Sequence, residues 1–281
     1  MTDSEDAFDP RLASFVAPIL ADGNGLPPEW WGPIWARPNR TPVSDLVRDG
    51  VISAEAAALL WQVAEDGGSL VVAAGPSGAG KTTMLTAIAD LLDARFRRVF
   101  LRGVHETFAF AAQADPDRTL VMVNEISPHL PIYTWGSAAR RTLRLAREGC
   151  RVMATMHAES VEELVYQLSS YPLRIPIADI GALSLVTLLD YWEDGRGVHR
   201  EIRAVAAVDA ENEGRSLVVD VVAERSARSE GLRLDVDAAE RLLRVRWRPA
   251  GDAVAAWRGK AEAIQARADA DRGSAAPGDA R

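Results

Sequence analysis

The sequence predicts an α/β protein whose mostly parallel sheet is covered by helices on both faces and is followed by antiparallel strands and C-terminal helices. Two observations carry this prediction. Short, wholly apolar segments such as residues 120–123 alternate with helical segments over residues 44–168, and strands buried on both faces are typically continuous apolar runs. From residue 182 onward, strand-like segments are separated only by turns, which is typical of antiparallel pairing.

Each element is expected from its own local pattern. Ser53 can cap a helix that Gly67 and Gly68 end, since a serine oxygen accepts from the first helical N–H groups and glycine adopts the left-handed conformation past the helix end. We expect parallel strands over residues 69–75, 98–102, 119–124 and 151–155, helices over 53–65, 81–93, 137–148 and 160–168, antiparallel strands over 182–190, 201–208 and 216–222, and helices over 236–246 and 251–269.

Composition narrows the class of protein. The chain has 281 residues, 48% of them hydrophobic, and a net charge of −8. No apolar run is long enough to span a bilayer, the N-terminus is acidic, and Cys150 is the only cysteine, so we expect a cytoplasmic protein without an internal disulfide. The acidic balance disfavours nucleic acid as a partner.

The chain divides into four expected regions. Residues 1–42 form an N-terminal arm and a strap rich in tryptophan and proline, in which Trp30, Trp31 and Trp35 need an apolar surface to pack on. That surface is the chain's own core or a subunit interface. Residues 43–225 form the α/β core, residues 226–270 a helical appendage, and residues 271–281 a disordered tail.

A glycine-rich loop between an expected strand and an expected helix fits the phosphate-binding pattern GxxxxGK[ST]. Glycines allow several backbone N–H groups to point at phosphate oxygens, and the helix that follows adds its positive end. Lys81 is one of only two lysines among 32 basic residues, and its compact ammonium suits β- and γ-phosphate oxygens, while the Thr82 hydroxyl suits Mg²⁺. The expected nucleotide-binding residues are Gly75, Pro76, Ser77, Gly78, Ala79, Gly80, Lys81, Thr82 and Thr83.

Two further residues follow apolar strands at the edge where this loop lies. Glu125 ends the segment 120–125, and His157 ends the segment 153–157. Ligands of open α/β sheets bind at the carboxyl ends of the strands, so we expect Glu125 to act in catalysis and to hold Mg²⁺, directly or through water. His157 can bond a γ-phosphate oxygen or couple the nucleotide state to the helix that follows.

Four blocks of sequence together resemble the secretion and pilus ATPases of type II and type IV systems, the group containing PilT and the CpaF/Tad-pilus motors. The blocks are the linker and first helix (residues 40–61), the phosphate loop (75–83), the segment Asp-Pro-Asp-Arg-Thr-Leu-Val-Met-Val-Asn-Glu (115–125), and the segment ending in Met-Ala-Thr-Met-His-Ala-Glu-Ser (148–160).

This resemblance implies a RecA-like P-loop NTPase that hydrolyses ATP with Mg²⁺. It implies a homo-oligomeric ring, usually a hexamer, that moves an inner-membrane platform protein from the cytoplasmic side, where it is peripherally associated with the membrane. It also implies a nucleotide contact from Arg37.

The chain departs from the pattern of that family at the acidic box, which should supply a water-activating base. One alignment places Arg102 and Gly103 there, and another places Glu106 and Thr107 there. We favour Glu106 as a catalytic residue, because a buried site without a base hydrolyses slowly. Only about 40 residues precede the first family-like helix, where most relatives have a complete N-terminal domain.

Arginines at positions 140, 141, 144 and 147 mark the helix after Glu125. They form a solvated basic face paired with neighbouring acids, or one of them acts across a subunit boundary on the transferred charge. The leading hypothesis for the chain is an ATP-hydrolysing motor subunit. The alternatives are an ATP-binding regulatory or assembly subunit with little hydrolysis, and a P-loop small-molecule kinase. DNA transfer is disfavoured by the acidic charge.

Overall fold

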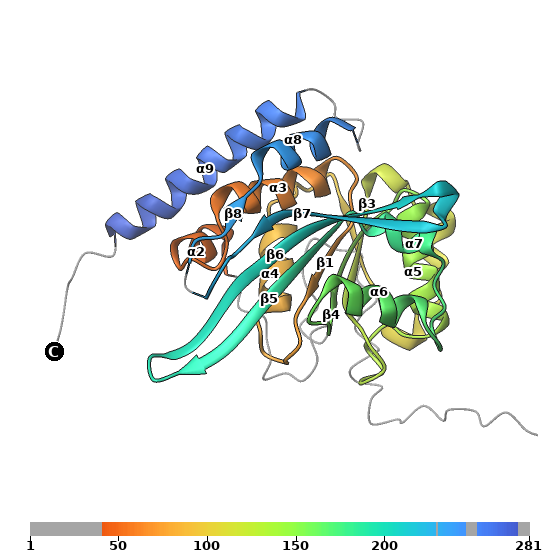
Figure 1. Ribbon diagram of the computed structural model, residues 1–281. Helices are drawn as coiled ribbons and strands as arrows, with labels where there is room; N and C mark the ends of the chain where they lie inside the picture. Colours follow the sequence, from red (N-terminus) through yellow and green to blue (C-terminus); the bar gives the residue numbers. More distant parts are fainter. Residues whose placement is uncertain (1–40, 229, 246–251, 275–281) are drawn as a thin grey trace, which may run out of the picture.

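An eight-stranded sheet runs through the computed structural model, which describes residues 41–228, 230–245 and 252–274 (Figure 1). Its order is β2-β3-β4-β1-β5-β6-β7-β8, in which the pairs from β2 to β5 are parallel and the pairs β5–β6, β6–β7 and β7–β8 are antiparallel. The strands are β2 (Arg97–Phe100), β3 (Thr119–Ile126), β4 (Arg151–Met156), β1 (Leu70–Ala73), β5 (Leu185–Asp194), β6 (Gly197–Glu211), β7 (Ser216–Glu224) and β8 (Arg233–Leu234).

This order confirms the expected fold class. Strand β4 lies between β1 and β3, which is the RecA-like arrangement, and the antiparallel strands follow it in the chain. Because the carboxyl ends of parallel strands meet at one edge, the segments that follow β1, β3 and β4 are neighbours in space.

Helices cover both faces of the sheet, and each face has its own apolar core (Figure 1). Alternate residues of β1 serve opposite faces: Leu70 and Val72 belong to one core, Val71 and Ala73 to the other. The first core includes residues of α2 (Val43–Arg48), α3 (Ala54–Glu65), α4 (Lys81–Ala89), α8 (Val236–Val245) and α9 (Ala253–Ser274), and the second includes residues of α5 (Ser137–Arg147), α6 (Val161–Ser169) and α7 (Ile177–Ile180).

The C-terminal helix α9 packs along α3 and α2. Trp257 is buried there, and its indole N–H donates to the Glu55 carbonyl oxygen at 2.9 Å. The helix continues to Ser274, through the first residues of the segment expected to be disordered. Among the described residues, no helix is both long and apolar enough to cross a membrane.

Several boundaries differ from the sequence-based prediction, among them the end of α4, both ends of β5 (residues 185–194 rather than 182–190) and both ends of β6. Helix α4 ends at Ala89 rather than at residue 93, because the Arg98 guanidinium takes the carbonyl oxygens of Ala89 and Leu92 and so closes the helix end. Strand β6 begins at Gly197 rather than at residue 201, because β5 and β6 stay paired as far as Asp194 and Gly197. The β5–β6 hairpin is therefore longer than expected. Arg37 and the strap with Trp30, Trp31 and Trp35 lie outside the described residues.

Candidate nucleotide-binding site

The phosphate loop joins β1 to α4, as the motif requires. Gly78 and Gly80 have φ values of +77° and +91°, a region in which a residue with a side chain is strained. Gly80 is the residue that precedes α4, whose first residue is Lys81. The loop thus turns through two left-handed glycines, and the N-terminus of α4 lies directly behind Lys81, which favours an anion at this point.

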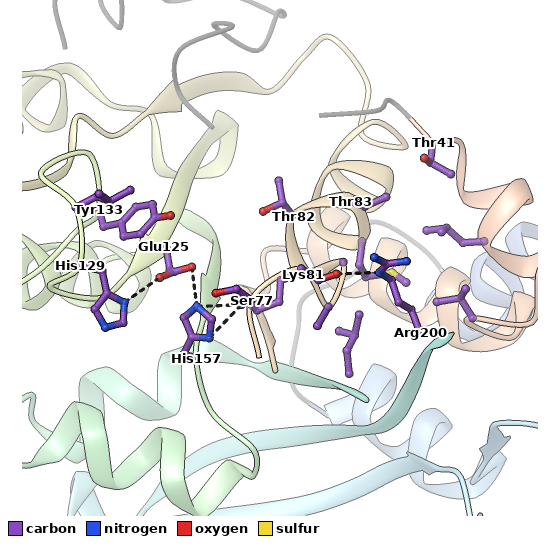
Figure 2. Close-up of a pocket in the computed structure, with 18 residues that line it drawn as sticks. Thr41, Ser77, Lys81, Thr82, Thr83, Glu125, His129, Tyr133, His157 and Arg200 are labelled. Carbon is purple, nitrogen blue, oxygen red and sulfur yellow. Dashed lines mark hydrogen bonds and ion pairs between the residues drawn. The ribbon is translucent and has the colours of Figure 1, made fainter. Parts of the chain in front are cut away.

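Lys81, His157 and Glu125 meet at the carboxyl edge of the sheet (Figure 2). The Lys81 Nζ atom lies 3.3 Å from both ring nitrogens of His157, and His157 Nε2 lies 3.4 Å from Glu125 Oε2. Glu125 is the seventh residue of β3, and His157 directly follows β4. The structure therefore brings these three predicted residues together from separate parts of the chain.

These side chains line a cavity of about 690 Å³, within the range of sites that bind small molecules. Of the predicted loop residues, Ser77 through Thr83 line it, whereas Gly75 and Pro76 do not. The full lining is Thr41, Leu46, Val51, Ser77, Gly78, Ala79, Gly80, Lys81, Thr82, Thr83, Met84, Glu125, His129, Leu130, Tyr133, His157, Leu189 and Arg200.

The hydrogen bonds of His157 define which ring nitrogen carries the proton in the neutral ring. Its Nδ1 atom lies 2.8 Å from the Gly75 carbonyl oxygen, and a carbonyl oxygen can only accept, so Nδ1 is the donor. Nε2 is then free to accept from the Lys81 ammonium. The backbone carbonyl of His157 accepts from the Gln167 amide of α6 at 3.0 Å. His157 therefore connects the phosphate loop to α6.

One carboxylate oxygen of Glu125 accepts no hydrogen bond from the described residues. Its side chain is only 9% exposed, and its Oε1 atom is buried without a hydrogen-bond partner among the described residues. The Nδ1 atom of His129 lies 3.9 Å from that oxygen. A buried carboxylate oxygen without a donor is suited to a metal ion or to ordered water.

Burial shifts the acid–base properties of two groups beside Glu125. Burial lowers the pKa of the Lys81 ammonium below its usual 10.5, and the negative charge of Glu125 opposes part of that shift. Burial, together with the same carboxylate, raises the pKa of the Tyr133 phenol to about 12. The cavity is therefore a place where charge is poorly solvated, so a bound anion would interact strongly with Lys81.

The cavity residues could hold Mg²⁺ together with a phosphate ligand, but not by themselves. No cluster of three or more His, Cys, Asp or Glu side chains that could hold a metal ion occurs among the described residues. The Thr82 hydroxyl and the Glu125 carboxylate both line the cavity, and Mg²⁺ is usually held by one or two protein oxygens together with substrate phosphates and water. The residues fit a metal that arrives with a phosphate ligand.

Glu106 does not line this cavity. Its carboxylate is used locally: one oxygen accepts from the Arg102 backbone N–H at 3.1 Å and the other from the Phe108 backbone N–H at 2.8 Å. The predicted role of Glu106 as a catalytic residue therefore stays a prediction, and the structure does not bring this side chain to the other site residues.

Three polar residues of the cavity lie outside the sequence blocks that marked the rest of the site. His129 and Tyr133 lie in the segment after β3, where the Thr134 backbone N–H donates to the Glu125 carbonyl oxygen at 2.8 Å and so folds this segment back over the strand end. Arg200 reaches the cavity from β6. The chain has only four histidines, so one located four residues after Glu125 was a usable signal for His129.

The four arginines of α5 are all engaged within the chain. Arg144 and Arg147 pair with the buried carboxylate of Asp179, at 2.9 and 3.2 Å. Arg141 pairs with Glu148, and Arg140 donates to the carbonyl oxygens of Pro172 and Leu173. Of the two interpretations of this helix, intrachain pairing accounts for the contacts that the structure shows.

Part of the chain is similar to solved structures. No protein-family model and no curated protein match the chain. One similar solved structure is the VirB11 ATPase from the Brucella suis type IV secretion system in complex with sulphate, with 20% identity, a TM-score of 0.39, and coverage of 53% of this chain and 50% of that chain. Another is the Legionella pneumophila ATPase DotB, with 17% identity, a TM-score of 0.40, and coverage of 64% of this chain and 54% of that chain. The chain thus spans about half the length of each.

Proposed function

We propose that this chain is an ATP-hydrolysing motor subunit of a type II/IV secretion system or a type IV/Tad-like pilus. It binds MgATP at the phosphate loop and couples hydrolysis to movement of a membrane platform protein. The observation that carries the enzymatic part is the convergence of Lys81, Glu125 and His157, at 3.3 and 3.4 Å, from separate strand ends. The motor part rests on the resemblance of the four sequence blocks.

Binding follows from charge and geometry. The Lys81 ammonium, partly desolvated, attracts the β- and γ-phosphate oxygens. The N–H groups of the loop and the positive end of α4 add donors on the same side. Thr82 and Glu125 would hold Mg²⁺, which supplies neutralisation of charge on the phosphate oxygens.

The hydrolytic step needs a group that receives a proton. A water oxygen attacks the terminal phosphorus, a new P–O bond forms, and the bond to the bridging oxygen of ADP breaks. The water proton passes to a base, and ADP and phosphate are released. Glu125 is suited to that role, because it is the carboxylate that lines the cavity among the described residues, and its Oε1 atom has no competing donor.

His157 is suited to report the state of the nucleotide. It contacts the Gly75 carbonyl and Lys81 through its ring and α6 through its backbone carbonyl. When Lys81 moves to phosphate oxygens, the imidazole Nε2 loses its donor, and once it takes up a proton from solvent it can donate to the same phosphate. A backbone shift at His157 that accompanies this change would reach α6, because Gln167 donates to the His157 carbonyl oxygen.

The assembly is proposed from the sequence resemblance. We infer a homo-oligomeric ring, a hexamer as in the motors that the four blocks resemble. It would act at the cytoplasmic face of the inner membrane on a platform protein. An arginine from a neighbouring subunit, or Arg37 of the same chain, would complete the nucleotide contacts.

The experiment is MgATP hydrolysis by the full chain, measured over a range of protein concentration because a ring-dependent site shows a cooperative onset. Lys81→Ala removes the phosphate charge, and Glu125→Gln keeps the shape of the side chain but removes the base. The matched control is Glu148→Gln, an exposed glutamate paired with Arg141. The proposal fails if the wild-type chain, at concentrations where it assembles, turns over ATP no faster than Lys81→Ala.

A second candidate is an ATP-binding regulatory or assembly subunit with little hydrolysis. The observation that favours it is that both Glu106 oxygens are committed to backbone N–H groups, which leaves the expected acidic box without a free base. Tight ATP binding without turnover, unchanged when a platform protein is added, supports this candidate. Hydrolysis that appears on that addition contradicts it.

A further inference from the structure

Arg200 enters the nucleotide cavity from an element that carries no nucleotide-binding motif. It lies on β6, in the long β5–β6 hairpin, and lines the cavity. Its Nε–H donates to the carbonyl oxygen of Gly78, in the middle of the phosphate loop, at 2.8 Å. The two residues are separated by 122 positions in the sequence, so the loop is held by a strand from the antiparallel part of the sheet.

Tyr191 and Gly80 both lie against the Arg200 side chain. Its guanidinium carbon lies 5.5 Å from the centre of the Tyr191 ring on the paired strand β5, a cation–π distance. A Cβ atom at Gly80 would lie 3.2 Å from the Arg200 Cδ atom. Gly80 therefore has two reasons to lack a side chain: its positive φ and the close passage of Arg200.

The guanidinium has donors left for a ligand. Of its five N–H groups, one is used at Gly78, and no described residue provides a hydrogen-bond or ion-pair partner for Nη1 and Nη2. A planar fork of this kind can bond a carbonyl oxygen through Nε while it presents Nη groups to a phosphate. The second lysine of the chain cannot serve here, because Lys260 is bound to Gln62 and Glu65 on α3.

Arg200 lies on the other side of the loop from the proposed reaction centre. Figure 2 shows Glu125, His157 and His129 on one side of Lys81, and Arg200 with Thr41 on the opposite side. The cavity is also lined by the apolar side chains of Leu46, Val51 and Leu189. Leu189 lies beside Gly80, as Arg200 does, and the Val51 carbonyl oxygen accepts from the Ile202 N–H, two residues after Arg200. If the terminal phosphate lies at Glu125, the rest of the nucleotide extends past the loop toward Arg200 and Leu189, which both lie beside Gly80.

We propose that Arg200 is a nucleotide-binding residue that holds the α- and β-phosphates and, through the Gly78 carbonyl, positions the phosphate loop. This inference rests on the proposed function in one respect, that a nucleoside triphosphate occupies the cavity with its terminal phosphate at Glu125. It assigns to the β5–β6 hairpin a direct share in nucleotide binding.

The test is equilibrium binding of ADP and of a non-hydrolysable ATP analogue to the full chain, by calorimetry, for Arg200→Ala, Arg200→Lys and the control Arg196→Ala. Arg196 is an exposed arginine at the tip of the same hairpin and does not line the cavity. Arg200→Ala is expected to weaken both ligands by the same factor, about tenfold, because it contacts phosphates that both contain. Arg200→Lys should recover less than half of the loss on a logarithmic scale, because a point charge cannot bond Gly78 and a phosphate together.

The outcomes separate the two proposals. If the wild-type chain binds neither ligand, the proposed function fails. If it binds both and Arg200→Ala binds ADP within twofold of wild type, only the role of Arg200 fails. A loss confined to the ATP analogue would place Arg200 at the terminal phosphate and also overturn the assignment. Thermal unfolding without ligand shows whether Arg200→Ala folds. If Arg200→Ala does not fold, Arg200→Lys decides the question: a loss of at least threefold in ADP affinity supports the role of Arg200, and a smaller loss overturns it.

Discussion

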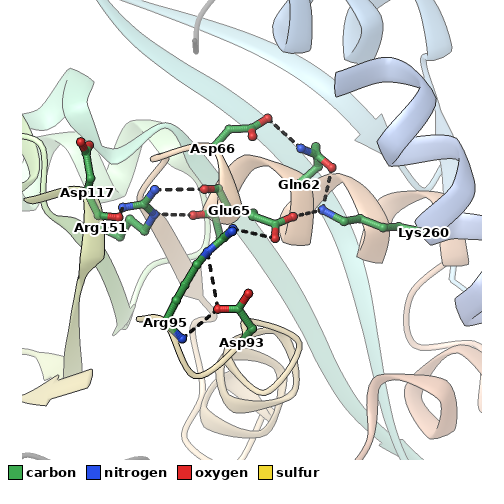
Figure 3. A network of polar contacts seen from close by, with 9 residues as sticks. Gln62, Glu65, Asp66, Asp93, Arg95, Asp117, Arg151 and Lys260 are labelled. Carbon is green, nitrogen blue, oxygen red and sulfur yellow. Dashed lines mark hydrogen bonds and ion pairs between the residues drawn. The ribbon is translucent and has the colours of Figure 1, made fainter. Parts of the chain in front are cut away.

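Arg151 and Glu125, at opposite edges of the sheet, differ in how far their hydrogen-bonding groups are used. At the amino edge, the Arg151 guanidinium donates to the carbonyl oxygens of Ala64, Glu65, Pro116 and Asp117 at 2.6 to 3.3 Å (Figure 3). At the carboxyl edge, Glu125 Oε1 is buried without a hydrogen-bond partner among the described residues, and the contacts of Lys81 to His157 are 3.3 Å long.

The amino edge is extended by a network around the end of α3 (Figure 3). Lys260 of α9 bonds Gln62 and Glu65, and its ammonium lies 4.5 Å from the centre of the Trp61 ring. Gln62 in turn donates to Asp66, and Glu65 pairs with Arg95. This network joins α9, α3 and the segment before β2.

The difference indicates which polar groups stabilise the fold and which are available to bind a ligand. The four hydrogen bonds of the Arg151 guanidinium stabilise the amino edge, because a buried donor with several acceptors is costly to disturb. The Nε1 atom of Trp61 and the Nε atom of Arg98 are exceptions at this edge, since both are buried without a hydrogen-bond partner among the described residues. At the carboxyl edge, buried charged groups with unmade hydrogen bonds lower the stability of the free chain. Binding of a phosphate anion and its metal cation would supply the missing partners. Substitutions at the two edges should therefore separate activity from stability.

The largest expected effect is on activity at the carboxyl edge. Glu125→Gln should reduce the rate of MgATP hydrolysis by about 1000-fold, since general-base catalysis contributes on that order. The same variant should lower the melting temperature of the free chain less than an amino-edge variant does, because it loses the attraction to Lys81 but Oε1 has no hydrogen bond to lose. A fall in melting temperature as large as that of an amino-edge variant would contradict the proposed contrast between the edges.

The next effect is on stability at the amino edge. Arg151→Met removes four hydrogen bonds to carbonyl oxygens and leaves those carbonyls with fewer donors. The free energy of unfolding should fall by about 3 kcal/mol, measured by urea denaturation. ATP affinity per folded molecule should stay within twofold of wild type, and a large loss of affinity would show that the edges are not independent.

The two lysines of the chain give a smaller, matched comparison. Lys260→Met should lower the free energy of unfolding by about 1–2 kcal/mol, since it breaks contacts with Gln62, Glu65 and Trp61. Lys81→Met should leave that free energy unchanged or raise it, because burial disfavours the Lys81 charge more than Glu125 favours it. Equal losses in the two variants would contradict this account.

The smallest effect is a pH dependence. Burial lowers the pKa of Lys81 below 10.5, so the folded chain gives up this proton at a lower pH than the unfolded chain does. In the window between the lowered pKa and 10.5, the unfolded chain binds more protons, and the Lys81 contribution to the free energy of unfolding rises with pH. ATP affinity should fall over the same window, because the ammonium charge is lost.

The difference between wild type and Lys81→Met isolates this effect from other titrating groups, including Tyr133, whose pKa is raised to about 12. The account expects the stability difference between wild type and Lys81→Met to rise with pH while the ATP affinity of wild type falls. If both quantities change in the same direction with pH, Lys81 is not the cause.

The sequence was sufficient for the fold and for the part of the site that follows strand ends. The apolar runs before Gly75, Glu125 and His157 placed all three residues at one edge of a parallel sheet, since strand direction alone determines that edge. The phosphate loop was marked by its glycines, whose positive φ values at Gly78 and Gly80 the structure shows.

Residues that reach the site by tertiary packing could not be predicted in this way. Arg200 depends on where the β5–β6 hairpin lies relative to the loop, and no local spacing encodes that position. The environment of Glu106 depends on a turn that directs its carboxylate to the Arg102 and Phe108 N–H groups. Local sequence could place Glu106 near a strand end but could not show which donors would occupy it.

The most direct test of the central claim is a crystal structure of the chain with Mg²⁺ and a non-hydrolysable ATP analogue. The account predicts that the Lys81 Nζ atom leaves His157 to bond terminal phosphate oxygens, with Glu125 and His157 both facing that phosphoryl group. A bound triphosphate with Glu125 and His157 turned away from its terminal phosphate would contradict the account and leave only attachment of a nucleotide at the loop.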